Sequence, residues 1–123
     1  MDDEAIADLF AGLGPVSIRR MFGGKGVYHR GEIVGIDIFD SILVKGDAET
    51  SATYEAAGGE RWVYEGKNRP VAMPYWSVPA DVMEDMDEMA RWARLAYDAA
   101  LRAKASKAAK PQAKTKKQLR PSR

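Results

Sequence analysis

The chain has 123 residues, of which 46% are hydrophobic and 30% charged, with a formal net charge of +1 and no cysteine. This length predicts one domain, and the composition excludes collagen, a disulfide scaffold and a membrane protein. Without cysteine, thiolate metal sites and cysteine nucleophiles are also excluded. The acidic start Met1-Asp2-Asp3-Glu4 is followed by no apolar secretory segment, and no apolar run could span a membrane. We therefore expect a cytoplasmic protein with no membrane partner.

The net charge hides an uneven distribution of charged residues. Residues 104–123 hold eight lysines and arginines and no acidic residue, whereas residues 1–103 hold 11 basic and 18 acidic residues, a net charge of −7. The sequence thus predicts a folded domain over residues 1–103 and a basic tail over residues 104–123. We expect the tail to be disordered, because it lacks large apolar residues except Leu119 and contains two prolines. Such a tail is typical of a polyanion-binding arm or of a solvated extension.

The first half of the chain predicts two helices around an antiparallel meander. Apolar residues recur at helical spacing over residues 2–13, where glycines and a proline then end the pattern. Alternating residues separated by turns predict three or four strands within residues 16–45. Residues 47–57 read as a second helix that Gly58 and Gly59 stop. The residues expected to face inward on it are Ala52, Tyr54 and Ala56.

A hairpin is predicted next, with strands over residues 61–65 and 71–77. Pro74 cannot donate to a strand ladder, so its strand should lie at a sheet edge or be bulged there. Four aromatic residues gather on this hairpin. They could stack nucleic-acid bases, but packing in a core or a partner interface is the simpler interpretation. These residues are Trp62, Tyr64, Tyr75 and Trp76.

The longest helix is predicted to begin near residue 80 and to end near residue 103. Asp81 could cap its start, with Glu84 three residues later as in a capping box. Acidic residues gather in its first turns and arginines follow, which suits the helix dipole. The residues expected to face the core are Val82, Met86, Met89, Ala93, Ala96 or Tyr97, and Ala100.

Three features could carry chemistry, and each has a plainer interpretation. The segment Gly23–Gly26 could approach a phosphate, but phosphate-binding loops lead into a helix, so a bend between strands is favoured. His29 could be a base or a metal ligand, yet no second histidine stands at ligand spacing, so a structural or solvent role is favoured. Asp37 and Asp40 could hold Mg²⁺ or share acid/base work, but a solvent-facing strand position for Asp37 and a turn for Asp40 are favoured. We expect no catalytic residue, metal or cofactor.

The basic tail is the strongest functional candidate from chemistry alone. Its side chains could neutralise phosphates of DNA or RNA without reading base sequence. The residues concerned are Lys104, Lys107, Lys110, Lys114, Lys116, Lys117, Arg120 and Arg123.

Several short motifs, spread over residues 5–103, resemble the TfoX/Sxy N-terminal domain. The most specific is Met-Phe-Gly-Gly, followed by Gly26-Val27-Tyr28, and later elements include Met73-Pro74-Tyr75 and Val78-Pro79. The motif residues, which we expect to be structural, are Met21, Phe22, Gly23, Gly24, Gly26, Tyr75 and Pro79. Because a basic tail follows the last helix, we expect a single-domain member without the C-terminal TfoX domain.

The resemblance implies an α+β fold in which helices cover one side of an antiparallel sheet, as in the type III secretion chaperone group. The predicted order of elements agrees with it. Two-domain members regulate natural competence, as coactivators with the cyclic-AMP receptor protein. The resemblance therefore implies a non-enzymatic regulatory or interaction module that acts in transcription through a protein partner, with weak nucleic-acid contact by the tail. The alternatives are a chaperone-like dimer without nucleic acid, or a small ligand-binding protein or enzyme. Both a monomer and a homodimer stay open.

Overall fold

The computed structural model of the protein describes residues 1–21 and 23–118, with side chains described as far as residue 108. Its elements, in chain order, are α1 (Asp3–Leu9), β1 (Ser17–Met21), β2 (Gly24–His29), β3 (Glu32–Ile38), β4 (Ser41–Lys45), α2 (Ser51–Ala56), β5 (Arg61–Glu65), β6 (Pro70–Ser77), α3 (Ala80–Met83) and α4 (Met86–Gln118). This order confirms the predicted α+β class.

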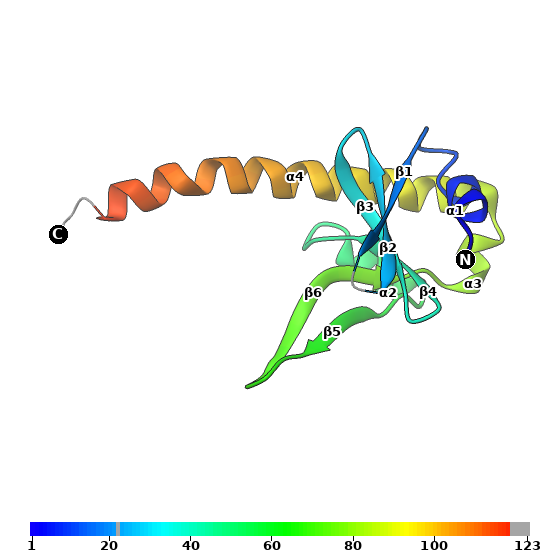
Figure 1. The fold of residues 1–123 in the computed structure, drawn as a ribbon, viewed down its shortest axis with the longest axis horizontal. Helices are drawn as coiled ribbons and strands as arrows, with labels where there is room; N and C mark the ends of the chain where they lie inside the picture. Colours follow the sequence, from blue (N-terminus) through cyan, green and yellow to red (C-terminus); the bar gives the residue numbers. More distant parts are fainter. Residues whose placement is uncertain (22, 119–123) are drawn as a thin grey trace.

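The strands form one six-stranded antiparallel sheet in the order β1-β2-β3-β4-β6-β5. The helices lie on one face of it, with α4 running across the strands, while the β5–β6 hairpin extends away from α4 (Figure 1). The main core fills the space between the sheet and the helices. It includes Ile6 and Phe10 near α1, Val34 and Val44 from the sheet, and Trp92 from α4.

Small residues bring α4 close to the sheet. Ala93, Ala96 and Ala99 are fully buried on it, and an alanine surface lets a helix backbone approach its neighbour closely. Trp92 is also fully buried and packs on the ring of Tyr54, with 4.6 Å between ring centroids. The Tyr54 hydroxyl donates a hydrogen bond to the Lys45 carbonyl at 2.8 Å, which ties α2 to β4.

A bulge in β3 decides which residues point away from the helices. Val27 pairs with Gly35, but the next residue of β2 pairs with Ile33, so β3 carries one extra residue there. Val34 belongs to the main core, and a Cβ on Gly35 would lie 3.0 Å from the Phe10 ring, so both face the helices. After this bulge the alternation of β3 is reversed, and Ile36 points to the opposite face.

The strand that contains Pro74 is bulged there, which confirms one of the two predicted alternatives, a sheet edge or a bulge. Its strand is not at the edge, because β6 lies between β4 and β5. Instead, Arg61 pairs with Trp76 and Val63 with Ala72, so the ladder skips the region of Pro74. The Pro74 carbonyl still accepts a hydrogen bond from the Gly46 N–H at 3.0 Å.

Helix boundaries differ from those predicted. The first helix ends at Leu9 and α2 begins at Ser51; Tyr54 is buried, but the neighbouring inward-facing alanines predicted for α2 are exposed. The predicted long helix is two helices, with Asp85 rather than Asp81 as the side-chain cap of α4. Met86 is 86% exposed and not in the core, because it lies at this break.

The C-terminal end of α4 also lies beyond the expected one near residue 103. The helix continues to Gln118, into the segment predicted to be a disordered tail, because that segment is rich in alanine, lysine and glutamine, which favour helix. Residues 119–123 of the predicted tail, with Arg120 and Arg123, lie outside the described residues. Within residues 1–21 and 23–118, no helix has both the length and the apolar character needed to cross a membrane.

The break between α3 and α4 gives a test of the cap. The Asp85 carboxylate accepts hydrogen bonds from the backbone N–H groups of Asp87 and Glu88, each at 3.1 Å. We expect Asp85→Ala to lower the free energy of unfolding by about 1 kcal/mol in urea denaturation. Asp81→Ala is the matched control and should change it by less than about 0.5 kcal/mol. Equal losses in the two variants would contradict the assignment of the cap.

Candidate functional site

The face of the sheet that lies away from the helices carries a second apolar cluster. Strand alternation places Leu43 and Tyr75 on this face, opposite the main-core residues Val44 and Trp76 beside them in the chain. Ile36, Leu43 and Tyr75 are buried here although no helix residue belongs to the cluster. The partly buried members are Met21, Ile33, Ile38, Trp62 and Met73.

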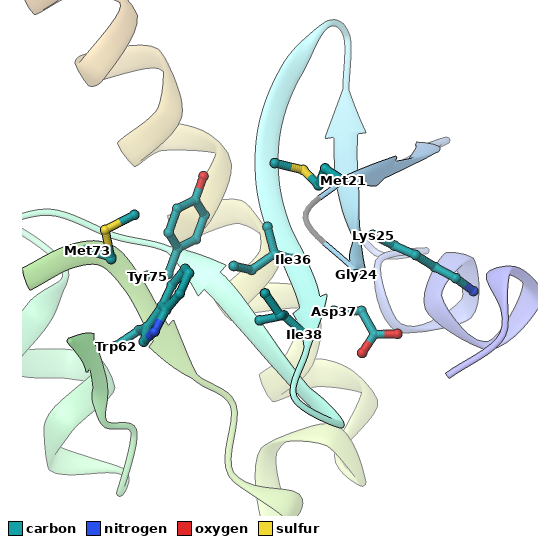
Figure 2. Close-up of a pocket in the computed structure, with 9 residues that line it drawn as sticks. All are labelled: Met21, Gly24, Lys25, Ile36, Asp37, Ile38, Trp62, Met73 and Tyr75. Carbon is teal, nitrogen blue, oxygen red and sulfur yellow. The ribbon is translucent and has the colours of Figure 1, made fainter. Parts of the chain in front are cut away.

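A hollow of about 200 Å³ opens in this cluster, and we call it the outer hollow (Figure 2). Its walls come from β1, β2 and β3 on one side and from β5 and β6 on the other. Since β1 and β5 are the two edges of the sheet, the sheet curls around the hollow. The lining residues are Met21, Gly24, Lys25, Ile36, Asp37, Ile38, Trp62, Met73 and Tyr75.

The two charged lining residues turn away from the hollow (Figure 2). The Lys25 ammonium lies 2.8 Å from the Asp3 carboxylate and 3.0 Å from the Met1 carbonyl oxygen. Asp37 pairs with the N-terminal ammonium at 3.2 Å. The expected solvent-facing position of Asp37 is therefore wrong, since only 9% of the residue is exposed. What remains in the hollow is aliphatic, aromatic and thioether surface.

Glycines of the Met-Phe-Gly-Gly region shape this site. A Cβ on Gly26 would lie 2.6 Å from the Met21 sulfur and 3.0 Å from the Tyr28 ring, so a glycine here leaves room for Met21. A Cβ on Gly24 would collide with the Asp37 carbonyl oxygen, so this glycine lets β2 approach β3. Gly23 has a φ of +77°, as predicted for a bend between strands.

The motif residues divide between this site and the scaffold. Met21, Gly24 and Tyr75, which are far apart in the sequence, meet in the outer hollow. Pro79 lies elsewhere, just before α3, where its carbonyl accepts hydrogen bonds from Val82 and Met83. Phe22 lies outside the described residues.

The other candidates from the sequence have structural roles. His29 Nδ1 lies 2.7 Å from the Pro15 carbonyl oxygen, which can only accept, so Nδ1 donates. The His29 ring also packs edge-on against Tyr97, at 4.9 Å between centroids. Asp40 is a turn residue with a φ of +56°. The described residues contain no group of three or more His, Cys, Asp or Glu side chains that could hold a metal.

Aromatic residues of the hairpin split between the two faces of the sheet. Trp76 is buried in the main core, whereas Tyr75 and Trp62 line the outer hollow. Tyr64 is 54% exposed and pairs across the hairpin with Val71, which is 42% exposed. The structure thus confirms packing for three of the four and leaves Tyr64 on the surface.

One residue of this surface was missed by the sequence reasoning. Phe39 is 73% exposed, and its ring lies edge-on to Trp62 at 6.0 Å between centroids. Its φ of +55° places a large apolar side chain in the tight turn before β4. An aromatic residue beside Asp40 in a predicted turn is the signal that could have found it, because turns favour small polar residues.

Burial on the outer face raises the pKa of Tyr75 to about 12, with a smaller contribution from the neighbouring Tyr28. The Lys45 ammonium lies 5.3 Å from the centre of the Tyr75 ring. The Tyr75 ring therefore lines the outer hollow and also lies close to the Lys45 ammonium.

Comparison with protein-family models matches residues 8–100 with the TfoX N-terminal domain. The match covers the sheet, α1 in part, α2, α3 and the half of α4 that packs on the sheet. It does not extend over the basic residues from Lys104 onward. No curated protein matches the sequence significantly.

The two glycines of β2 should differ in how much they tolerate a side chain. Gly24→Ala sets a Cβ against backbone and should lower the free energy of unfolding by about 1–3 kcal/mol, as overpacking usually does. Gly26→Ala meets the flexible end of Met21 and should cost less. Urea denaturation of both variants measures the difference, and a larger loss for Gly26→Ala would contradict this packing.

The Tyr75 phenol should make stability fall at high pH. Its folded pKa of about 12 lies above the unfolded value of 10.0, so its contribution is complete below pH 10 and is lost as the pH rises through 12. The full loss corresponds to about 3 kcal/mol. Urea denaturation between pH 10 and 12 should show a shallower fall for Tyr75→Phe than for the wild type. An unchanged slope in the variant would contradict the burial of this phenol.

Proposed function

The chain belongs to the TfoX N-terminal domain family, and on that premise we propose that it is a non-enzymatic regulatory module that binds a protein partner through the outer face of its sheet. By analogy with the competence regulators that its motifs resemble, the partner acts in transcription. The basic C-terminal segment adds weak, sequence-independent contact with nucleic acid.

The observation that carries this proposal is the apolar surface around the outer hollow. Phe39 and Tyr64 are both more than half exposed. The Phe39 ring lies against Trp62, which lines the hollow, and strand alternation places Tyr64 on the same face as Trp62. Strand alternation places Val71 on the same face as Met73, which continues the surface toward the tip of the hairpin. A contiguous exposed apolar surface of aromatic residues and methionine beside a hollow is typical of an interaction site.

The chemistry of the hollow supports binding rather than catalysis. Its two charged residues are engaged in ion pairs that turn away from it. The remaining groups are hydrocarbon, thioether, indole and phenol, and burial holds the phenol of Tyr75 in its neutral form well above neutral pH. Such a surface can recognise an apolar side chain of a partner, but it does not present a group suited to act as a general base.

A photo-reactive side chain can test the proposed surface in the cell that makes the protein. Phe39→p-benzoylphenylalanine keeps an aromatic ring at the rim of the hollow. On illumination it should form a covalent adduct with the partner, because the partner covers the rim. The matched control is Met86→p-benzoylphenylalanine, since Met86 is 86% exposed at the start of α4. Mass spectrometry identifies the adducts.

The outcomes separate the alternatives. An adduct with another protein at position 39 alone supports the proposal, and Tyr64→Ser should then weaken rebinding of that protein by about tenfold. An adduct of two copies of this chain would instead support the chaperone-like dimer. Identical adducts at both positions, or none at position 39, would contradict a partner on this face.

A further inference from the structure

A second hollow opens where α4 leaves the sheet. It has a volume of about 280 Å³ and lies between the start of β3, the end of β4 and residues 100–107 of α4. Three lysines line it: Lys45 from β4, and Lys104 and Lys107 from α4. We call it the lysine hollow. The predicted basic tail, residues 104–123, does not include Lys45.

The acidic residues near the lysine hollow balance only part of this positive charge. Glu32 lies in the hollow and pairs with Lys104 at 3.0 Å. Asp47 stands close to Lys45, but it is held by a bidentate pair with Arg102 at 2.7 and 3.1 Å. Glu49 pairs with the same arginine at 3.2 Å. Among the described residues, the ammonium groups of Lys45 and Lys107 therefore line the lysine hollow without an ion-pair partner.

The pKa of Lys45 shows that Lys107 is close enough to repel it. Partial burial and the positive charge of Lys107 lower its pKa, and Asp47 opposes the shift. Its position is also fixed, because it belongs to a strand and its ammonium lies over the Tyr75 ring. An anion placed between Lys45 and Lys107 would relieve the repulsion without rearranging the backbone.

The lysine hollow is continuous with the basic part of α4. After Asp98 the sequence contains no further acidic residue, and lysines recur at positions 104, 107, 110, 114 and 117. α4 runs on past the sheet along this stretch (Figure 1). The sequence thus continues the positive charge of the lysine hollow beyond Lys107.

We infer that the lysine hollow anchors the phosphodiester backbone of a nucleic acid, to which the lysines that follow in the sequence add further contacts. This rests on the nucleic-acid contact in the proposed function and places part of that contact inside the folded domain. The regularly spaced phosphates of a nucleic acid can be neutralised by lysines that recur at short intervals in the sequence. An anionic membrane fits less well, because residues 102–118 contain no large apolar residue that could enter a bilayer.

Fluorescence anisotropy with a short labelled DNA duplex tests the anchor in the full chain. Lys45→Gln and Lys107→Gln should each weaken binding severalfold. Each should also lower the magnitude of the slope of log Kobs against log salt by about 0.9, the value for one lost phosphate contact on a duplex. Lys67→Gln, in the turn of the β5–β6 hairpin, is the matched control and should leave both unchanged. Lys45→Arg keeps the charge and should retain the slope.

Each result decides one question. If the wild-type chain binds and Lys45→Gln behaves like Lys67→Gln, the anchor is wrong while the nucleic-acid contact of the proposed function stands. If the wild-type chain binds neither duplex nor single-stranded RNA at low salt, both are wrong. Binding to anionic lipid vesicles but to neither nucleic acid would also overturn the inference. Circular dichroism of each variant confirms that the fold is kept.

Discussion

The helices cover only one face of the sheet, and the rest of this structure depends on that constraint. A sheet of alternating residues presents two faces, and the helices of this domain bury one of them against the main core. The other face must reduce its own contact with water. It does so by curling until β1 and β5, its two edges, contribute to the same hollow. The outer hollow is thus a consequence of the one-sided architecture.

The glycine motif acts within this constraint as a packing device. Gly24 and Gly26 lie in β2, where a side chain would strike the backbone of β3 or the sulfur of Met21. Their absence of side chains allows the strands to approach and Met21 to lie on the outer face. The family motif and the apolar surface are therefore connected, because the glycines make room for Met21, and Met21 and Tyr75 line the outer hollow.

The charged end of the molecule is organised by α4. Arg102 binds Asp47 and Glu49 near the start of α2, and Lys104 binds Glu32 of β3, so the helix is tied to the sheet where it departs from it. The guanidinium of Arg102 holds the pKa of Asp47 below its usual range. The lysines that follow Lys104 belong to the same helix. Tyr75 lines the outer hollow and Lys45 lines the lysine hollow, and the Lys45 ammonium lies 5.3 Å from the centre of the Tyr75 ring.

Local patterns were sufficient for much of the fold. Alternation and turn residues predicted β3, β4 and both strands of the hairpin, because the residues that define these strands are neighbours in the sequence. The bulge at Pro74 could be predicted from the sequence, because a proline cannot donate a backbone hydrogen bond in any strand of a sheet. Helix ends were less predictable. Aspartate is a favoured N-cap residue, so the sequence does not distinguish Asp81 from Asp85. The break between α3 and α4 makes Asp85 the cap.

The sequence by itself determined the class of fold, the family motif and the segregation of positive charge, because each is written in composition or in short spacing. Only the tertiary structure decided what these features make together. The extra residue in β3 reverses its alternation, so Ile36 faces outward while Asp37 turns toward the N-terminal ammonium. Met21 and Tyr75, and likewise Lys45 and Lys107, meet because strands distant in sequence pair and α4 crosses them. No local pattern encodes such meetings, since register and curvature arise from the packing of the whole sheet.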